Sequence, residues 1–245
     1  MFNLQIDRSY ADDWSTLREF LVKRSAVRSL EGALRSYSGQ LSDLQSRLSS
    51  PDSGGSVSFD GLRSDFSKVK SKVDSFLGVG SISEPAVVFG RSTSYSCGSV
   101  SVAPGTKTEV IPSLAHEYCH HVQMDYLSLE RISPVLCEGH AIGVELYVAR
   151  RFSDETGNEA FLFSPLSRQV SRLKTSYIWV CANLGIRPDK SLVSRPSSRD
   201  SFELGFLRNL ARPSSHAVGA AFFTLIPDGS RDSAYRGFLT GSLYF

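Results

Sequence analysis

Apolar residues recur at alternating steps of three and four in two stretches near the start of the chain. The first stretch carries Val27, Leu30, Leu34, Tyr37, Leu41, Leu44 and Leu48, and the second carries Leu62, Phe66, Val69, Val73 and Phe76. Such spacing places the apolar side chains on one narrow stripe of a helix. Residues 49–58, rich in Ser, Gly and Pro, separate the two stretches and cannot continue a helix. We therefore expect an antiparallel helical hairpin that forms an N-terminal domain over residues 1–80 and serves as a structural arm or as a recognition arm.

After residue 80 the hydrophobic pattern changes to short runs that alternate with polar residues. Residues 85–89 and 94–102 are predicted strands, because turn-forming Gly and Pro residues bound them. The second run alternates small polar with apolar residues, as a half-exposed edge strand does. Helices are predicted from Pro112 to about Leu127 and over 134–152, 165–184, 200–211 and 215–226. The pattern predicts an α+β fold, a small sheet followed by a helical C-terminal part, for a second domain over 81–245.

Length, charge and cysteine spacing narrow the class of protein. The 245 residues can bury one sizeable core, or one core with a small appendage. A net charge of +2, with basic residues spread along the chain, gives no indication of a nucleic-acid or membrane partner. The sequence contains no run of about 18 apolar residues, the length needed to span a bilayer. The N-terminus does not resemble a secretory signal. The four cysteines form no CxxC pair, so we expect buried thiols in a reducing compartment, the cytoplasm.

Three of the five histidines fall within six positions, in the segment SLAHEYCHHVQMDYL. His116 and His120 are four residues apart and so share one face of a helix. Two imidazoles at that spacing can bind one Zn²⁺ at about 2.0–2.1 Å each. Glu117 lies one position round the helix, where a general base could reach a metal-bound water without ligating the metal. A catalytic zinc site also needs a third protein ligand and one open position.

Glu138 could supply the third ligand. It follows His120 by 18 positions, which leaves room for the first helix to end and for a second helix to return alongside it. Glu145 lies two helical turns further on, where it could accept a hydrogen bond from the outer nitrogen of a ligand histidine or lie on a solvated face. His121 is expected on the helix surface or behind the ligands, and His140 is expected to be structural or to line the cleft.

The pattern HExxH at 116–120, followed by EGxAxxxE at 138–145, resembles the gluzincin metallopeptidases of the thermolysin and zinc-aminopeptidase type. The resemblance implies a zincin-like catalytic domain with Zn²⁺ bound by three ligands and a glutamate as catalytic base. Matched position by position, the ligands are His116, His120 and Glu138, and the base is Glu117. The thermolysin branch places Asp four residues after its ligand Glu, where this chain has Ile142, so the residue that orients a ligand histidine would have to be Glu145 or another group.

His216 stands at the start of a predicted helix rich in small residues. It is similar to the later His or Tyr with which gluzincins stabilise an oxyanion, a contact that typically contributes about 2.7–4 kcal/mol. A helix-capping histidine is the alternative. Tyr177 and Tyr235 are further candidates for the donor.

These features predict a zinc-dependent peptidase, an intracellular endopeptidase of narrow specificity that acts on a peptide or protein substrate. The metal would activate water, Glu117 would take its proton, and an extended substrate would pair with the strand edge at 94–102. Two alternatives stay open: an exopeptidase, which would need an anchor for the substrate terminus, and a non-catalytic zinc-stabilised protein in which the hairpin recognises a partner. The apolar tail 238–245 is expected to dock on the body of the protein, or else to plug the cleft.

Overall fold

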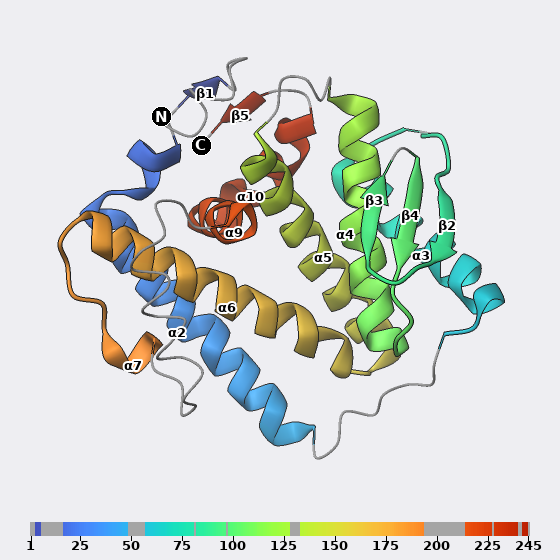
Figure 1. Cartoon of the computed structure of the whole chain (residues 1–245), viewed down its shortest axis with the longest axis horizontal. Helices are drawn as coiled ribbons and strands as arrows, with labels where there is room; N and C mark the ends of the chain where they lie inside the picture. Colours follow the sequence, from blue (N-terminus) through green and yellow to red (C-terminus); the bar gives the residue numbers. More distant parts are fainter. Residues whose placement is uncertain are drawn as a thin grey trace.

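A computed structural model describes residues 3–5, 17–48, 57–80, 82–96, 98–127, 133–193, 214–226, 228–239 and 242–244. The described chain is mostly helical, with a small sheet on one side, and is α+β at this coarse level (Figure 1). The helices are α2 (Arg24–Arg47), α3 (Phe59–Leu77), α4 (Lys107–Tyr126), α5 (Pro134–Thr156), α6 (Ala160–Asn183), α7 (Lys190–Val193), α9 (Ser215–Leu225) and α10 (Asp228–Leu239). The strands are β1 (Asn3–Gln5), β2 (Ala86–Phe89), β3 (Ser94–Ser96), β4 (Ser99–Val102) and β5 (Ser242–Tyr244).

The predicted strand over 94–102 is two strands, so that part of the prediction is wrong. Gly98 adopts a φ of 79°, a left-handed conformation that glycine reaches without steric cost, and the chain reverses there into an antiparallel β3–β4 pair. β4 pairs on its other side with β2, in parallel. The order β2-β4-β3 leaves β3 at an edge of this sheet, so the predicted substrate-facing edge is reduced to Ser94–Ser96.

The predicted antiparallel hairpin is also wrong, although both of its helices form. α2 lies along α6 and α3 lies along α4, so over their described lengths α2 and α3 do not pack on each other as a pair (Figure 1). Leu30 and Leu34 of α2 and Phe66 and Val73 of α3 are almost fully buried, in one cluster that also includes residues after residue 80. The apolar stripes of α2 and α3 were predicted correctly, but the helices against which they pack were not. An apolar stripe can be buried against any other apolar face. The domain boundary at residue 80 stays a prediction.

Helix α4 begins at Lys107, five residues before the predicted start. Thr106 and Glu109 form a capping box, in which the Thr106 backbone N–H donates to Glu109 Oε2 at 3.1 Å; such a box satisfies the free N–H groups of a first turn. Pro112 lies inside the helix. The helices predicted over 134–152, 165–184 and 215–226 are confirmed as α5, α6 and α9 with shifted ends, and the one predicted over 200–211 lies outside the described residues.

Helices α5 and α9 cross with their backbones in contact. A Cβ added at Gly219 would lie 2.5 Å from the Gly139 backbone nitrogen and 2.7 Å from its Cα, closer than carbon atoms normally approach. Glycine at both positions therefore permits this crossing. Gly139 follows Glu138, and Gly219 lies three residues after His216. The crossing therefore also brings the side chains of Glu138 and His216 together.

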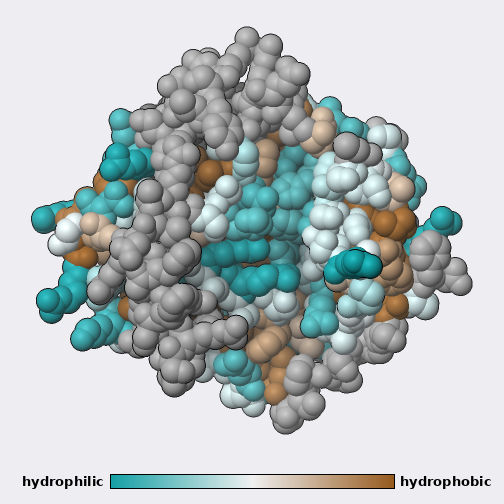
Figure 2. Space-filling model, in the orientation of Figure 1, coloured by the Kyte–Doolittle hydropathy of each residue, from teal (hydrophilic) through white to brown (hydrophobic). Residues whose placement is uncertain are grey.

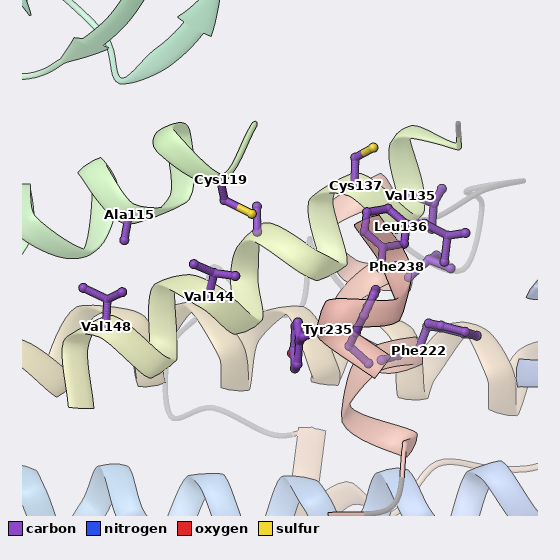
Figure 3. Packing of buried hydrophobic residues seen from close by; sticks show 14 of the residues in the cluster. Ala115, Cys119, Val135, Leu136, Cys137, Val144, Val148, Phe222, Tyr235 and Phe238 are labelled. Atoms are coloured by element: carbon purple, nitrogen blue, oxygen red, sulfur yellow. The ribbon is translucent and has the colours of Figure 1, made fainter. Parts of the chain in front are cut away.

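Helix α10 and the strand after it close the fold. Phe238, the first residue of the apolar tail, is fully buried, and Figure 3 shows it with Tyr235 against α5. β5 pairs with β1 in antiparallel register. The tail thus docks on the body of the protein, as expected, as far as the structure describes it. No helix among the described residues is long and apolar enough to cross a membrane.

Candidate metal centre

The side chains of His116, His120 and Glu138 converge from two neighbouring helices. On α4, the Nε2 atoms of His116 and His120 are 3.2 Å apart. From α5, Glu138 Oε2 lies 3.3 Å from the first of these nitrogens and 3.7 Å from the second. Two ligands of a tetrahedral zinc ion with bonds of about 2.0–2.1 Å are themselves about 3.3 Å apart. The three donor atoms therefore already have the mutual spacing that such an ion requires.

The outer nitrogen of His120 contacts a residue that the sequence analysis did not identify. His120 Nδ1 lies 2.8 Å from Gln123 Oε1, and Gln123 Nε2 donates to the Cys137 carbonyl oxygen at 2.9 Å. The amide oxygen of Gln123 can only accept, so His120 Nδ1 carries the proton and His120 Nε2 presents a lone pair to the cluster. The spacing of three residues along α4 could have indicated this partner.

The outer nitrogen of His116 faces Glu145, as the sequence predicted for a ligand histidine. Nδ1 lies 3.3 Å from Glu145 Oε2. The same carboxylate accepts a hydrogen bond from Arg168, and Arg172 Nη1 is 3.8 Å away. Although burial disfavours the carboxylate charge, contacts with His116 and Arg168 lower the pKa of Glu145 to about 2. Both arginines come from α6, and no local pattern near the HExxH segment indicated them.

Positive charge is favourable where these donor atoms meet. Burial alone would lower the pKa of His116, but its contacts with Glu138 and Glu145 raise that pKa to about 9. Burial would raise the pKa of Glu138, but its contacts with His116, His120 and His216 hold it well below its usual range. Lone pairs and carboxylate charge concentrated at one buried point can be balanced by a proton or by a metal ion. The donor set of two imidazoles and a carboxylate suits zinc.

Glu117 lies on α4 between the two histidines, is only 9% exposed, and accepts a backbone hydrogen bond from Tyr95. Burial raises the pKa of Glu117 above its usual value, and the nearby charges of His116 and His120 oppose this rise. A carboxylate whose pKa is raised is a stronger base than an ordinary carboxylate, which suits a proton acceptor. Because Tyr95 belongs to β3, its hydrogen bond also shows that the edge strand faces the cluster.

His216 reaches the cluster from the first turn of α9. Its Nε2 lies 3.0 Å from Glu138 Oε2, and its ring is parallel to that of His116 with centroids 6.2 Å apart. The donor atoms of His116, Glu138 and His216 all lie within 4.8 Å of one another, so two possible ligand triads share His116 and Glu138. We favour the triad with His120, because its Nε2 is 3.2 Å from that of His116. Ser214 caps α9 through its side chain, so His216 is not the cap.

The remaining two histidines are buried, so the helix-surface position considered for His121 is wrong. His121 Nε2 donates to the Ser83 carbonyl oxygen at 2.7 Å, and its Nδ1 lies 3.1 Å from the Tyr95 hydroxyl, so this ring fixes the sheet to α4. His140 is fully buried, and burial lowers the pKa of His140 to about 3. Neither ring reaches the cluster. Of the other two candidate donors, Tyr177 bonds Glu31 and the Asp189 backbone, and Tyr235, a residue of α10, packs beside His140.

One face of the molecule is hydrophilic at its middle. Figure 2 shows hydrophilic residues gathered at the middle of the face that Figure 1 presents, in the region of α5 and α6. The side chains of His116 and His120 are 10% and 18% exposed, that of Glu138 is 21% exposed and that of His216 is 46% exposed. The cluster is therefore most accessible on the side of α9.

Comparison of the chain with protein-family models, with curated proteins and with solved structures finds no match.

Proposed function

We propose that this protein is a zinc-dependent peptidase with a zincin-like catalytic domain. The observation that carries the proposal is the spacing of three donor atoms, Nε2 of His116, Nε2 of His120 and Oε2 of Glu138, at 3.2–3.7 Å from one another. Three protein ligands and one open position are typical of catalytic zinc, whereas structural zinc is usually closed by four. Zn²⁺ is thus the cofactor we propose.

The protein's own residues can supply the remaining parts of a hydrolysis. A zinc ion held here would act as a Lewis acid and lower the pKa of water to near neutrality. Glu117 accepts the proton of the attacking water and delivers it to the leaving amine. His216, on the accessible side of the cluster, donates a hydrogen bond to the carbonyl oxygen as negative charge develops on it.

The edge strand β3 supports an extended peptide or protein as the substrate. Since the Tyr95 backbone bonds Glu117 while β3 pairs with β4 through its other edge, the outer edge of β3 faces the catalytic base. A peptide aligned along this edge would pass Glu117 and reach the metal. We propose an endopeptidase rather than an exopeptidase, because the sequence carries no aminopeptidase motif of the GxMEN type.

Glu117→Gln tests the proposal directly. The change preserves the size of the side chain but removes the base, so we expect zinc to remain bound while cleavage of a peptide library is lost. Glu84→Gln is the matched control, since Glu84 is exposed and lies outside the cluster. If the Glu117→Gln variant still cleaves peptides as the wild type does, the proposed mechanism is wrong.

A non-catalytic zinc protein is the second candidate. It is favoured by the distances that bring His216, His116 and Glu138 within 4.8 Å of one another, since a fourth ligand from α9 would close the site. In that case zinc would bind in full occupancy and stabilise the fold, and no library peptide would be cleaved by the wild type or the control.

A further inference from the structure

A chain of buried hydrogen bonds connects His120 with the C-terminal helix α10. Its first link is the 2.8 Å contact between His120 Nδ1 and Gln123 Oε1. Gln123 Nε2 lies 3.0 Å from His140 Nδ1, and His140 Nε2 lies 2.9 Å from the Tyr235 carbonyl oxygen. The chain therefore runs from α4 through α5 to a backbone group of α10.

The position of each proton in this chain follows from its last member. A carbonyl oxygen can only accept, so the Tyr235 carbonyl requires a proton on His140 Nε2. In the neutral ring, His140 Nδ1 is then an acceptor, and it accepts a hydrogen bond from the Gln123 amide N–H. The Cys119 thiol, 3.1 Å from the same nitrogen, can also donate to it.

The same logic fixes the amide and then the ring of His120. Both N–H groups of Gln123 have acceptors, the Cys137 carbonyl oxygen at 2.9 Å and His140 Nδ1 at 3.0 Å. The amide oxygen must therefore face His120, and His120 Nδ1 must carry its proton. That leaves His120 Nε2 unprotonated and directed at His116 and Glu138, which is the tautomer a metal ligand needs.

We propose that Gln123 and His140 are positioning residues that hold His120 in its ligating tautomer, and that the docking of α10 is part of the metal centre. The inference rests on the proposed function only in taking His120 as a ligand. Neither Gln123 nor His140 stands at a motif position that matches a ligand or the base. The inference gives both of them a role, and gives one also to the Tyr235 carbonyl, 115 residues after His120 in the sequence.

Burial makes this chain difficult to replace with water. Gln123 is 1% exposed and His140 is 0% exposed. The His140 ring packs against Phe238 with centroids 4.6 Å apart and against Tyr235 at 5.4 Å; Figure 3 shows both of these aromatic residues on the helix beside α5. A donor or acceptor that loses its partner in such surroundings finds no solvent to bond, so the proton order has no low-energy alternative.

Gln123→Met tests the positioning role through zinc affinity. Methionine fills nearly the same volume but offers no strong donor or acceptor, so His120 loses the contact that fixes its tautomer. We expect zinc to bind about 10–100-fold more weakly. Gln169→Met is the matched control. Gln169 is 4% exposed and its Nε2 donates to the Thr224 hydroxyl at 2.9 Å, so the same change removes a buried amide that is not part of the hydrogen-bond chain. Its zinc affinity should equal that of the wild type.

The ring protons provide a readout that does not depend on catalysis. Long-range ¹H–¹⁵N spectra of the full wild-type chain should show the proton on Nδ1 of His120 and on Nε2 of His140. In Gln123→Met the His120 ring should populate both tautomers when zinc is removed. A proton on Nδ1 of His140 in the wild type, or equal zinc affinity in Gln123→Met and wild type, would overturn the proposal.

These outcomes separate the positioning role of Gln123 and His140 from the peptidase proposal. If the protein binds zinc, loses affinity in Gln123→Met and cleaves no peptide, the positioning role stands and the peptidase proposal is wrong. If it cleaves peptides but Gln123→Met leaves zinc affinity unchanged, the peptidase proposal stands and the positioning role is wrong.

Discussion

The backbone contact between Gly139 and Gly219 predicts the effect of adding one methyl group. In Gly219→Ala, the new Cβ would lie 2.5 Å from the Gly139 nitrogen and 2.7 Å from its Cα, whereas carbon atoms in contact are about 3.5–4.0 Å apart. The Val135 carbonyl oxygen would be closer still, at 2.2 Å, so α5 and α9 would have to separate by at least about 1 Å. Neighbours of this kind are backbone atoms, which cannot move aside as a flexible side chain can.

Overpacking of this kind costs about 1–3 kcal/mol. Since 1 kcal/mol shifts Tm by about 2–4 °C in a chain of this size, we expect Gly219→Ala to lower Tm by several degrees in thermal unfolding followed by circular dichroism. Separation of the helices would also move His216 away from Glu138, which it now contacts at 3.0 Å. The proposed peptidase activity should fall more than zinc affinity, because His116 and His120 both lie on α4.

Gly39→Ala is the control for this prediction. Gly39 is also helical, in α2, and a Cβ added there meets nothing within 4 Å. Alanine at such a position stabilises a helix by about 0.5–1 kcal/mol relative to glycine, so Tm should rise. Equal Tm values for Gly219→Ala and Gly39→Ala would refute the reasoning about the helix crossing.

Three further predictions concern the charges and ligands of the cluster. Because the pKa of His116 is raised to about 9, zinc must displace its proton at pH 7, and calorimetry in two buffers should report release of about one proton per zinc. This release should be about half as large near pH 9 and vanish well above it, where the ring is already neutral. Glu145→Gln removes the charge facing His116 Nδ1 and should weaken zinc binding about 10–100-fold, as measured by competition with a chelator. His216→Ala should lower kcat while zinc affinity is unchanged if the ring is an oxyanion donor, whereas lost zinc affinity would identify it as a ligand.

The sequence predicted the elements of the fold better than their neighbours. Heptad-like steps identified α2 and α3, because the burial of one stripe is a local property of a helix. They could not identify α6 and α4 as the faces against which those stripes pack, since contacts between distant segments leave no periodic signal. The capping box at Thr106 and Glu109 is visible in the sequence, whereas the prediction begins the helix at Pro112.

The same distinction holds at the metal centre. The spacing of His116 and His120 follows from helix geometry alone, and the return of Glu138 needed only a short connection between two helices. Gln123 could have been found by the same helical arithmetic. Arg168, which supports Glu145 from α6, could not, because nothing in its local sequence ties it to α5.

The choice between a catalytic and a purely structural zinc site depends on what closes the accessible side of the cluster. Exposure rises from His116, whose side chain is 10% exposed, to His216 at 46%, so the site opens toward α9. A structural site would gain little from the carboxyl of Glu117, because burial of this group disfavours its charge. A hydrolytic site gains a base whose raised pKa allows it to exchange a proton with water. The buried base on one side and an exposed histidine on the other therefore favour hydrolysis at this centre.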